Sequence, residues 1–273
     1  MHFTLFTSLA VAFYLIATAL IILSLRTEHQ SVEGKSRVWP RSFSLAGVAA
    51  LFHILSLTGA FWTPSGINFN FFSTGALVVL IVVLLLLTAG LTKPVEKLGL
   101  VIFPLAALSL ALKAAMPGKA HWLHNLSPGM EIHILVSILA YSLLNIAAVQ
   151  AILLALQDWQ LRHHHPHRLV RSLPPLQTME SLLFQMIGIG FVLLTASLLS
   201  GFLFLDDLFA QHLAHKTVLS ILAWLVFAVL LWGRVRYGWR GQTAIRWTLS
   251  GFVALMLAYF GSKLVLELIL ERV

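Results

Sequence analysis

Residues 71–91 read FFSTGALVVLIVVLLLLTAGL, an apolar run that contains no charged side chain. A helix rising about 1.5 Å per residue needs roughly twenty such residues to cross a 30 Å hydrocarbon core. Eight comparable runs follow one another along the chain, near residues 3–25, 41–62, 71–91, 97–116, 131–156, 182–205, 215–233 and 246–268. The sequence therefore predicts an all-α fold, a polytopic membrane bundle of about eight transmembrane helices within a single integral membrane domain over residues 1–273.

Composition supports a lipid environment. The 273 residues are 59% hydrophobic and 10% charged, whereas soluble domains are about one-quarter charged. The net charge of +8 does not indicate nucleic acid, because the basic residues lie in short gaps between apolar runs and not along one helical face. We therefore expect the lipid bilayer as partner and no nucleic acid.

The loops alternate in charge. Thirteen of the eighteen basic residues fall in one set of loops: Arg26, Lys35, Arg37, Arg41, Lys93, Lys97, Arg162, Arg168, Arg171, Arg234, Arg236, Arg240 and Arg246. The positive-inside rule assigns these loops to the cytoplasm. Both termini, with segments 63–70, 117–130 and 206–214, are then expected on the outer, periplasmic side of a bacterial inner membrane, and the first run is expected to be retained.

The absence of cysteine excludes a disulfide framework, a thiolate metal site and an iron–sulfur cluster. The sequence also contains no P-loop that could power transport with ATP, and no paired broken helices typical of secondary transporters. Any redox chemistry would therefore need a bound cofactor.

Polar residues recur in the fifth run, which begins Ser127-Pro128-Gly129-Met130-Glu131-Ile132-His133. Three further polar side chains follow at intervals of four: Ser137, Tyr141 and Asn145. Steps of four drift by only about 40° each, so these three side chains form a polar stripe on one side of the helix. Because buried polar groups in a bilayer need partners, the stripe indicates either interhelical packing or a cofactor or substrate surface with His133 at its outer mouth.

His53 is the other intramembrane histidine, within the second run. A neutral imidazole there is either a hydrogen-bond partner or a ligand for haem iron. A shared site with His133 needs a shift in depth, because the expected span boundaries place His53 about 10 Å deeper. We keep His133 and His53 as candidate cofactor-binding residues, with His133 preferred for the iron.

Several segments carry the resemblance to a known family. They are Ser127 to Gln150, the run KTVLSILAW at 216–224, Arg234, Trp239-Arg240-Gly241 and Ala258-Tyr259-Phe260-Gly261. In order and spacing they resemble the cytochrome c assembly family of the CcsA and CcmC type, most closely its YpjD-type members, with HemX-type proteins as relatives. The resemblance covers almost the whole chain, and its second half is rich in motifs.

The resemblance implies haem handling at the outer face, with His133 matching an outward-facing haem histidine. Three departures from the family pattern concern covalent haem attachment. The tryptophan-rich WWD segment expected before Lys216 is absent, Trp232 stands at one family histidine position, and about Leu270 stands at another. His212 and His215 occupy the loop where the WWD segment would lie, and they are weaker candidates.

These observations lead to a functional hypothesis. We expect a non-enzymatic membrane protein that binds haem b without covalent attachment, as a binding, delivery or regulatory component of cytochrome c biogenesis. The alternatives are a permease for a small molecule or metal ion, and an accessory or assembly subunit that binds other membrane proteins.

Overall fold

The computed structural model describes residues 2–27, 41–61, 67–68, 70–116, 122–123, 127–163, 173–204 and 214–261. Within these ranges eight α-helices are long and apolar enough to cross a membrane. Apart from helices, the described residues form two strands of two residues each. The predicted all-α bundle of about eight membrane helices is therefore confirmed, while the orientation of its termini stays a prediction.

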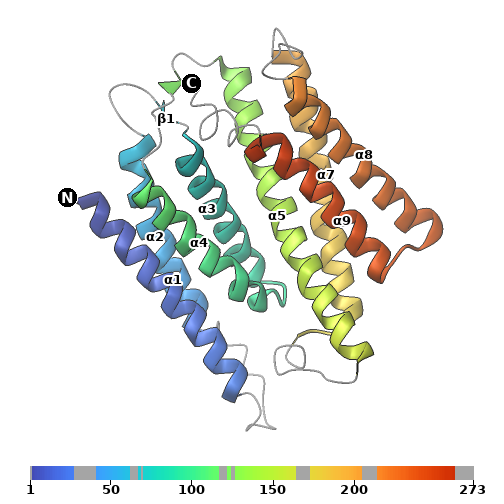
Figure 1. Cartoon of the computed structure of the whole chain (residues 1–273), viewed down its shortest axis with the longest axis horizontal. Coiled ribbons are helices and arrows are strands. Elements are labelled where there is room, and N and C mark those ends of the chain that lie inside the picture. Colours follow the sequence, from blue (N-terminus) through green and yellow to red (C-terminus); the bar gives the residue numbers. More distant parts are fainter. Residues whose placement is uncertain are drawn as a thin grey trace. The chain divides into compact units, whose positions relative to one another are not determined.

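Figure 1 shows the elements in chain order. They are α1 (His2–Thr27), α2 (Arg41–Phe61), β1 (Ile67–Asn68), α3 (Phe71–Gly90), the 3-10 helix η1 (Glu96–Leu98), α4 (Gly99–Ala115), β2 (Trp122–Leu123), α5 (Pro128–Arg162), α7 (Leu176–Phe204), α8 (Ala214–Tyr237), α9 (Gly241–Met256) and the π-helix η2 (Leu257–Gly261).

Helix ends follow local sequence signals. The side chain of Asn70 caps α3 by accepting a 2.7 Å hydrogen bond from the backbone N–H of Ser73. Ser127 caps α5 in the same way, accepting from the N–H of Met130 at 3.3 Å, and Pro128 occupies the first helical position. Helix α5 extends at both ends beyond the span expected at 131–156, and α7 begins six residues before the span expected at 182–205, because an α-helix can be longer than its apolar stretch.

The chain divides into two compact units. The first unit comprises Met1–Trp122 and Trp159–Pro174, and the second comprises Leu123–Asp158 and Pro175–Val273. Helices α1–α4 thus belong to the first unit, whereas α5, apart from its last turn, belongs to the second with α7, α8 and α9. The expectation of a single membrane domain stays a prediction.

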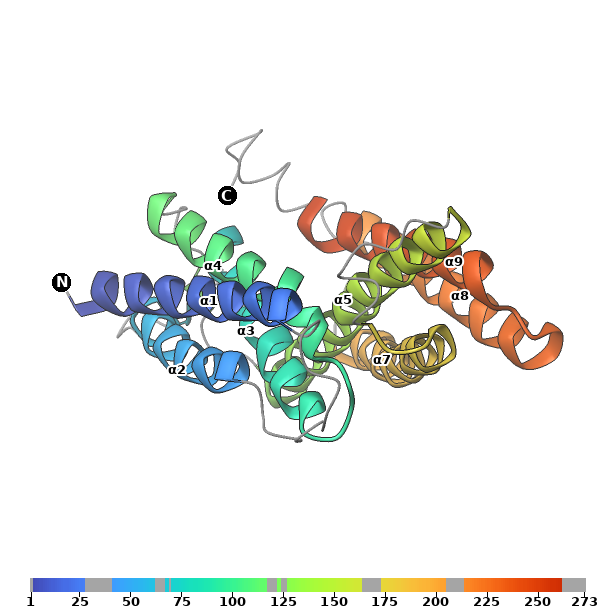
Figure 2. The same cartoon turned by 90° about the horizontal axis from the view of Figure 1, so that it is seen from below.

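In the first unit, α1 packs on α2 and α4, and α3 packs on the same two helices (Figures 1 and 2). Its core is aromatic: the ring of Phe103 stacks on Tyr14 at 6.1 Å and meets Phe43 edge-on at 5.7 Å. Phe43 in turn lies against Gly90, where an added Cβ would come within 2.6 Å of the phenyl ring. The glycine at the end of α3 therefore allows this helix to approach α2 closely.

In the second unit, α8 packs on α7, α9 and η2. The buried ring of Phe227 in α8 lies against Gly251 of α9, where an added Cβ would be 2.8 Å from the ring. Trp224 connects α8 to α7 by donating a 2.8 Å hydrogen bond to Oγ1 of Thr195 and stacking on Phe191. Glycine contacts and tryptophan side chains therefore fix the packing of these three helices.

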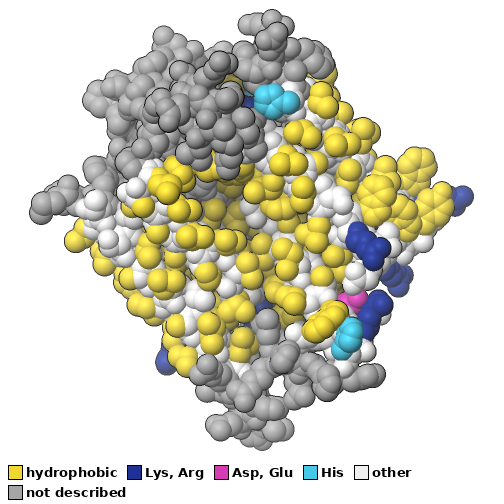
Figure 3. Space-filling model, in the orientation of Figure 1, with side chains coloured by type: hydrophobic (Ala, Val, Ile, Leu, Met, Phe, Trp, Pro, Cys, Tyr) yellow, Lys and Arg dark blue, Asp and Glu magenta, His cyan; other side chains and the backbone are white. Residues whose placement is uncertain are grey.

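The outer surface of the helices is apolar. Figure 3 shows hydrophobic side chains spread over the visible face, in contrast to the charged surface of a soluble protein. Large exposed apolar residues occur on every described membrane helix, and examples are Leu15, Leu51, Leu84, Leu108, Leu135, Val192, Leu222 and Val253. Such extended apolar exposure is what contact with lipid chains requires.

Candidate functional site

The candidate site begins at the first turns of α5. With the helix starting at Pro128 behind its Ser127 cap, His133 lies in the second turn, close to the end that is expected to face outward. Its imidazole is half-buried, which leaves part of the ring accessible. The Ser127 cap sets the start of α5 and therefore the helical turn on which His133 lies.

Two groups on α7 hold the His133 ring. Nδ1 lies 3.1 Å from the carbonyl oxygen of Ser197 and 3.0 Å from Oγ of Ser200. The hydroxyl of Ser200 donates to the same carbonyl oxygen at 2.9 Å. Because a carbonyl oxygen only accepts, its contact favours the tautomer with the imidazole proton on Nδ1. In that tautomer the neutral ring has its lone pair on Nε2.

Nε2 of His133 has no hydrogen-bond partner among the residues that the structure describes. A histidine whose Nδ1–H is held by the protein and whose Nε2 is unprotonated has the arrangement usual for metal-ligating imidazoles. No group of three or more histidine, aspartate or glutamate side chains that could hold a bare metal ion occurs within the described ranges. A single imidazole instead suits a metal that brings most of its own ligands, as haem iron does.

The polar stripe leaves His133 along α5 and contacts other helices. The hydroxyl of Ser137 donates to the carbonyl oxygen of His133 at 2.5 Å and lies 2.7 Å from Oγ of Ser197. Ser197 therefore contacts both polar residues at the start of α5. These hydrogen bonds fix the rotation of α5 against α7.

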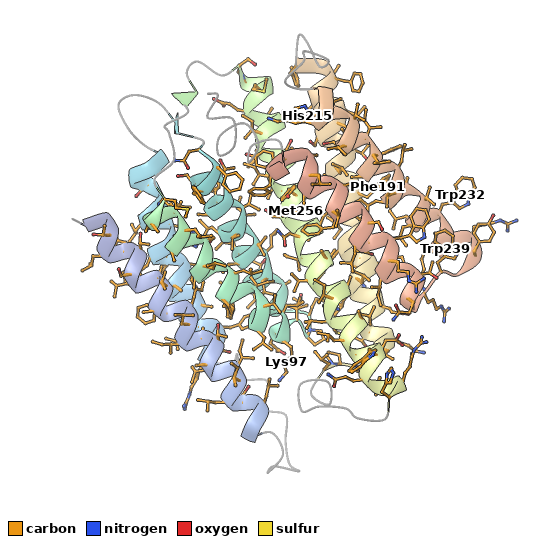
Figure 4. All side chains as sticks on the ribbon, viewed as in Figure 1. Lys97, Phe191, His215, Trp232, Trp239 and Met256 are labelled. Atoms are coloured by element: carbon orange, nitrogen blue, oxygen red, sulfur yellow. The ribbon has the colours of Figure 1, made fainter. Side chains whose placement is uncertain are left out.

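Tyr141 lies in the next part of the stripe and is buried. Its hydroxyl donates to Sδ of Met256 at 2.5 Å, and its ring lies 6.0 Å from Tyr259 and 5.7 Å from Phe260. Figure 4 shows Met256 at the end of α9, on the side of that helix nearest α5. Asn145, the third stripe residue, is half-buried, and no hydrogen bond is recorded for its side chain within the described ranges. Two of the three stripe residues therefore serve helix packing.

His53 has a different environment, inside the first unit. The ring is 0% exposed, and Nδ1 lies 3.3 Å from the hydroxyl of Tyr14. Nε2 is buried without a hydrogen-bond partner among the described residues. Nearby, Nζ of Lys113 donates to the carbonyl oxygen of Ser56 at 2.8 Å. His53 is therefore enclosed by its own helices, whereas His133 is partly open.

No contact with His133 is recorded for the other histidines that the structure describes. His215 is exposed at the start of α8 (Figure 4), and His163 packs its ring on Trp159. Trp232, at a family histidine position, is 69% exposed. His212 and Leu270 lie outside the described residues.

Ser197 and Ser200 are the residues of this site that sequence reasoning missed. They lie more than sixty positions from His133 along the chain, so no local spacing connects them. The available signal was their occurrence three residues apart in an apolar helix, which places both hydroxyls on one face.

Comparison with known proteins identifies the family. The family described as cytochrome C assembly protein matches residues 42–270 of this chain. The chain belongs to the cytochrome c assembly protein family. Within it, the inner membrane protein YpjD of Escherichia coli K12 is 34% identical over 267 residues, which cover 97% of this chain and 98% of that protein.

More distant members of the cytochrome c assembly protein family also match. The cytochrome c biogenesis protein CcsA of Chlamydomonas reinhardtii is 28% identical over 192 residues, covering 67% of this chain and 53% of that protein. CcsA of Rippkaea orientalis is 29% identical over 109 residues, covering 36% and 32%. No solved structure matches. Together with its eight membrane helices, the family assignment identifies the chain as a multi-pass protein of the bacterial inner membrane.

Proposed function

We propose that this protein binds haem b non-covalently at the start of α5, with Nε2 of His133 as an axial ligand of the iron. The observation that supports the proposal is the contact of Nδ1 with the carbonyl oxygen of Ser197, which favours a proton on that nitrogen and a lone pair on Nε2. Bound haem would supply an iron centre for electron transfer or for delivery to another protein. The chain itself would supply the ligand and its orientation.

The half-buried position of His133 fits this role. A ring that is partly open can be reached by a macrocycle, while the serines of α7 keep the imidazole from rotating. Met130 and Val136 lie three residues before and after His133 on the same side of α5, are half-buried, and would cover part of a porphyrin. The environment therefore combines one strong ligand with apolar surface.

We further propose a binding, delivery or regulatory role in cytochrome c biogenesis without haem-lyase activity. This part rests on the departures from the family pattern: the missing WWD segment, and Trp232 and Leu270 at histidine positions. Without those groups the chain would hold haem but would not attach it covalently to a second protein.

The test is an absorption spectrum of the protein purified in mild detergent, recorded oxidised and after reduction with dithionite, with haem supply unrestricted. We expect a Soret band with reduced α and β bands typical of a b-type haem. His133→Ala should lose these bands. His163→Ala is the control, because it removes an exposed histidine just beyond the other end of α5, and it should keep them.

His53→Leu provides a second comparison. Because the His53 ring is wholly enclosed, we expect this variant to retain the haem bands at unchanged stoichiometry. Loss of the bands in a folded His53→Leu variant would contradict this expectation. A spectrum that stays flat during haem titration of the unaltered protein would reject haem binding and favour assembly with another membrane protein.

A further inference from the structure

The connection between α8 and α9 forms a folded hairpin, here called the arginine hairpin (residues 232–247). Trp239 folds back over Gly233, where an added Cβ would collide with the indole ring. The backbone N–H of Trp239 also donates to the carbonyl oxygen of Gly233 at 3.2 Å. Gly238 and Gly241 adopt positive φ angles of 67° and 53°, which are costly for other residues. The hairpin is therefore a defined turn.

Arg234 holds the hairpin in place. Nη1 donates to the carbonyl oxygen of Trp239 at 3.1 Å, and the guanidinium carbon lies 4.6 Å from the centroid of the Phe184 ring on α7. The charge of Arg234 is therefore directed at the Phe184 ring and one of its N–H groups at a backbone carbonyl, both within the second unit. It is a structural cation, unlike the other arginines of the hairpin.

Three further arginines, Arg236, Arg240 and Arg246, are exposed. No hydrogen bond or ion pair is recorded for them within the described part of the chain. Two carboxylates reach the start of α9: Glu180 accepts from the N–H of Gly241 at 2.6 Å, and Asp158 accepts from Nε2 of Gln242 at 2.6 Å. Within the described residues, no ion pair is recorded between either carboxylate and the three arginines.

Large apolar side chains lie among these arginines. Trp232 is 69% exposed, Val235 87% and Tyr237 72%. Figure 3 shows hydrophobic and basic side chains together along the edge formed by this connection, and Figure 4 shows Trp232 and Trp239 there. A partner of this surface must offer anionic groups and apolar chains side by side.

We infer that the arginine hairpin is a binding site for anionic phospholipids of the cytoplasmic leaflet. Guanidinium groups bind phosphate oxygens with paired N–H donors, and Trp232, Val235 and Tyr237 would lie between acyl chains at the interface. A phospholipid carries its phosphate next to its acyl chains, whereas inorganic phosphate and nucleic acids have no comparable apolar part. The positive-inside rule places this hairpin at the leaflet that carries the negative surface potential.

The test uses native mass spectrometry of the full chain in detergent, titrated separately with phosphatidylglycerol and phosphatidylcholine. We expect tighter binding of phosphatidylglycerol. The triple variant Arg236→Gln/Arg240→Gln/Arg246→Gln should weaken that binding on the order of 100-fold, since each basic residue near an anionic surface contributes roughly a factor of five. Binding of phosphatidylcholine should change little.

A second triple variant, Arg41→Gln/Lys93→Gln/Lys97→Gln, removes the same charge from the cytoplasmic ends of the first unit and should leave phosphatidylglycerol binding nearly unchanged. An equal loss in both triple variants would overturn the inference, because it would show a diffuse charge effect. Equal affinity of the unaltered protein for the two lipids would overturn it as well.

Folding is checked for each variant by its thermal unfolding midpoint. If the glutamine variant unfolds, Arg236→Lys/Arg240→Lys/Arg246→Lys replaces it, because lysine keeps the charge but loses the paired donors. That variant should bind phosphatidylglycerol more weakly than the unaltered protein, and unchanged binding would contradict recognition by arginine.

Discussion

Nδ1 of His133 on α5 lies 3.0 Å from Oγ of Ser200 on α7, although the two residues are 67 positions apart in the sequence. This contact, with the carbonyl oxygen of Ser197, connects the candidate haem ligand to a second helix. The orientation of the imidazole thus depends on the packing of α5 against α7. A substitution on α7 should therefore alter the haem affinity that depends on His133.

Ser200→Ala should weaken haem binding without abolishing it. The substitution removes the hydroxyl but leaves the Ser197 carbonyl oxygen as acceptor for Nδ1–H. Loss of such supporting contacts typically lowers the affinity of a metal site about 10- to 100-fold. Titration with haem, followed at the Soret band, measures the change. Ser181→Ala, at an exposed position of the same helix, is the control, and an equal effect of both substitutions would argue against a role for Ser200.

Tyr14→Phe should destabilise the first unit. It removes the only hydroxyl recorded against the His53 ring within the described residues, and so takes a hydrogen-bond partner from the enclosed imidazole. An unsatisfied buried polar group costs about 1–3 kcal/mol. Denaturant unfolding of the detergent-solubilised protein measures the loss. The double variant Tyr14→Phe/His53→Leu should recover part of it, since no polar ring then remains to be satisfied.

Gly251→Ala should lower the free energy of unfolding by about 1–3 kcal/mol, because its Cβ would lie 2.8 Å from the buried ring of Phe227 and force the helices apart. Gly188→Ala is a matched control in a neighbouring helix, since nothing lies within 4 Å of the added Cβ there. We expect that control to be neutral or to stabilise by about 0.5–1 kcal/mol through lower chain entropy. Thermal unfolding in detergent compares the two variants, and equal destabilisation would contradict close packing at Gly251.

The predicted orientation can be tested by cysteine labelling, because the natural sequence contains no cysteine. Thr92→Cys places a single thiol at an exposed position in the connection between α3 and η1, and Met116→Cys places one at the exposed residue that follows α4. A membrane-impermeant maleimide applied to spheroplasts should label Met116→Cys at once and Thr92→Cys only after permeabilisation. The reverse pattern would invert the assignment of the termini to the outer side.

The sequence predicts the number and the type of the helices well, because the bilayer itself demands a minimum apolar length. The expected spans at 41–62 and 71–91 agree closely with α2 (Arg41–Phe61) and α3 (Phe71–Gly90). The apolar span expected from residue 182 begins six residues after the start of α7 at Leu176. The length of an apolar run reflects the thickness of the hydrocarbon core, whereas the start of α7 is set by Pro175, because a proline is disfavoured inside a helix.

The site was predictable only in part. His133 and the stripe follow from the spacing of polar residues on one helix. Their partners on α7 depend on how that helix is rotated about its axis, and a helix that is apolar on most sides carries little information about rotation. The hydroxyls of Ser197 and Ser200 therefore became assignable only in three dimensions.

The π-helical turn from Leu257 to Gly261 has a consequence for comparing relatives of this protein. Its hydrogen bonds span one more residue than those of an α-helix, so the turn is wound more widely. This winding determines which faces of Tyr259 and Phe260 meet Tyr141. Deleting one residue here would turn the two rings by about 100° while leaving α9 up to Met256 in register. Single-residue gaps at this point of an alignment should therefore mark family members with a differently shaped aromatic cluster.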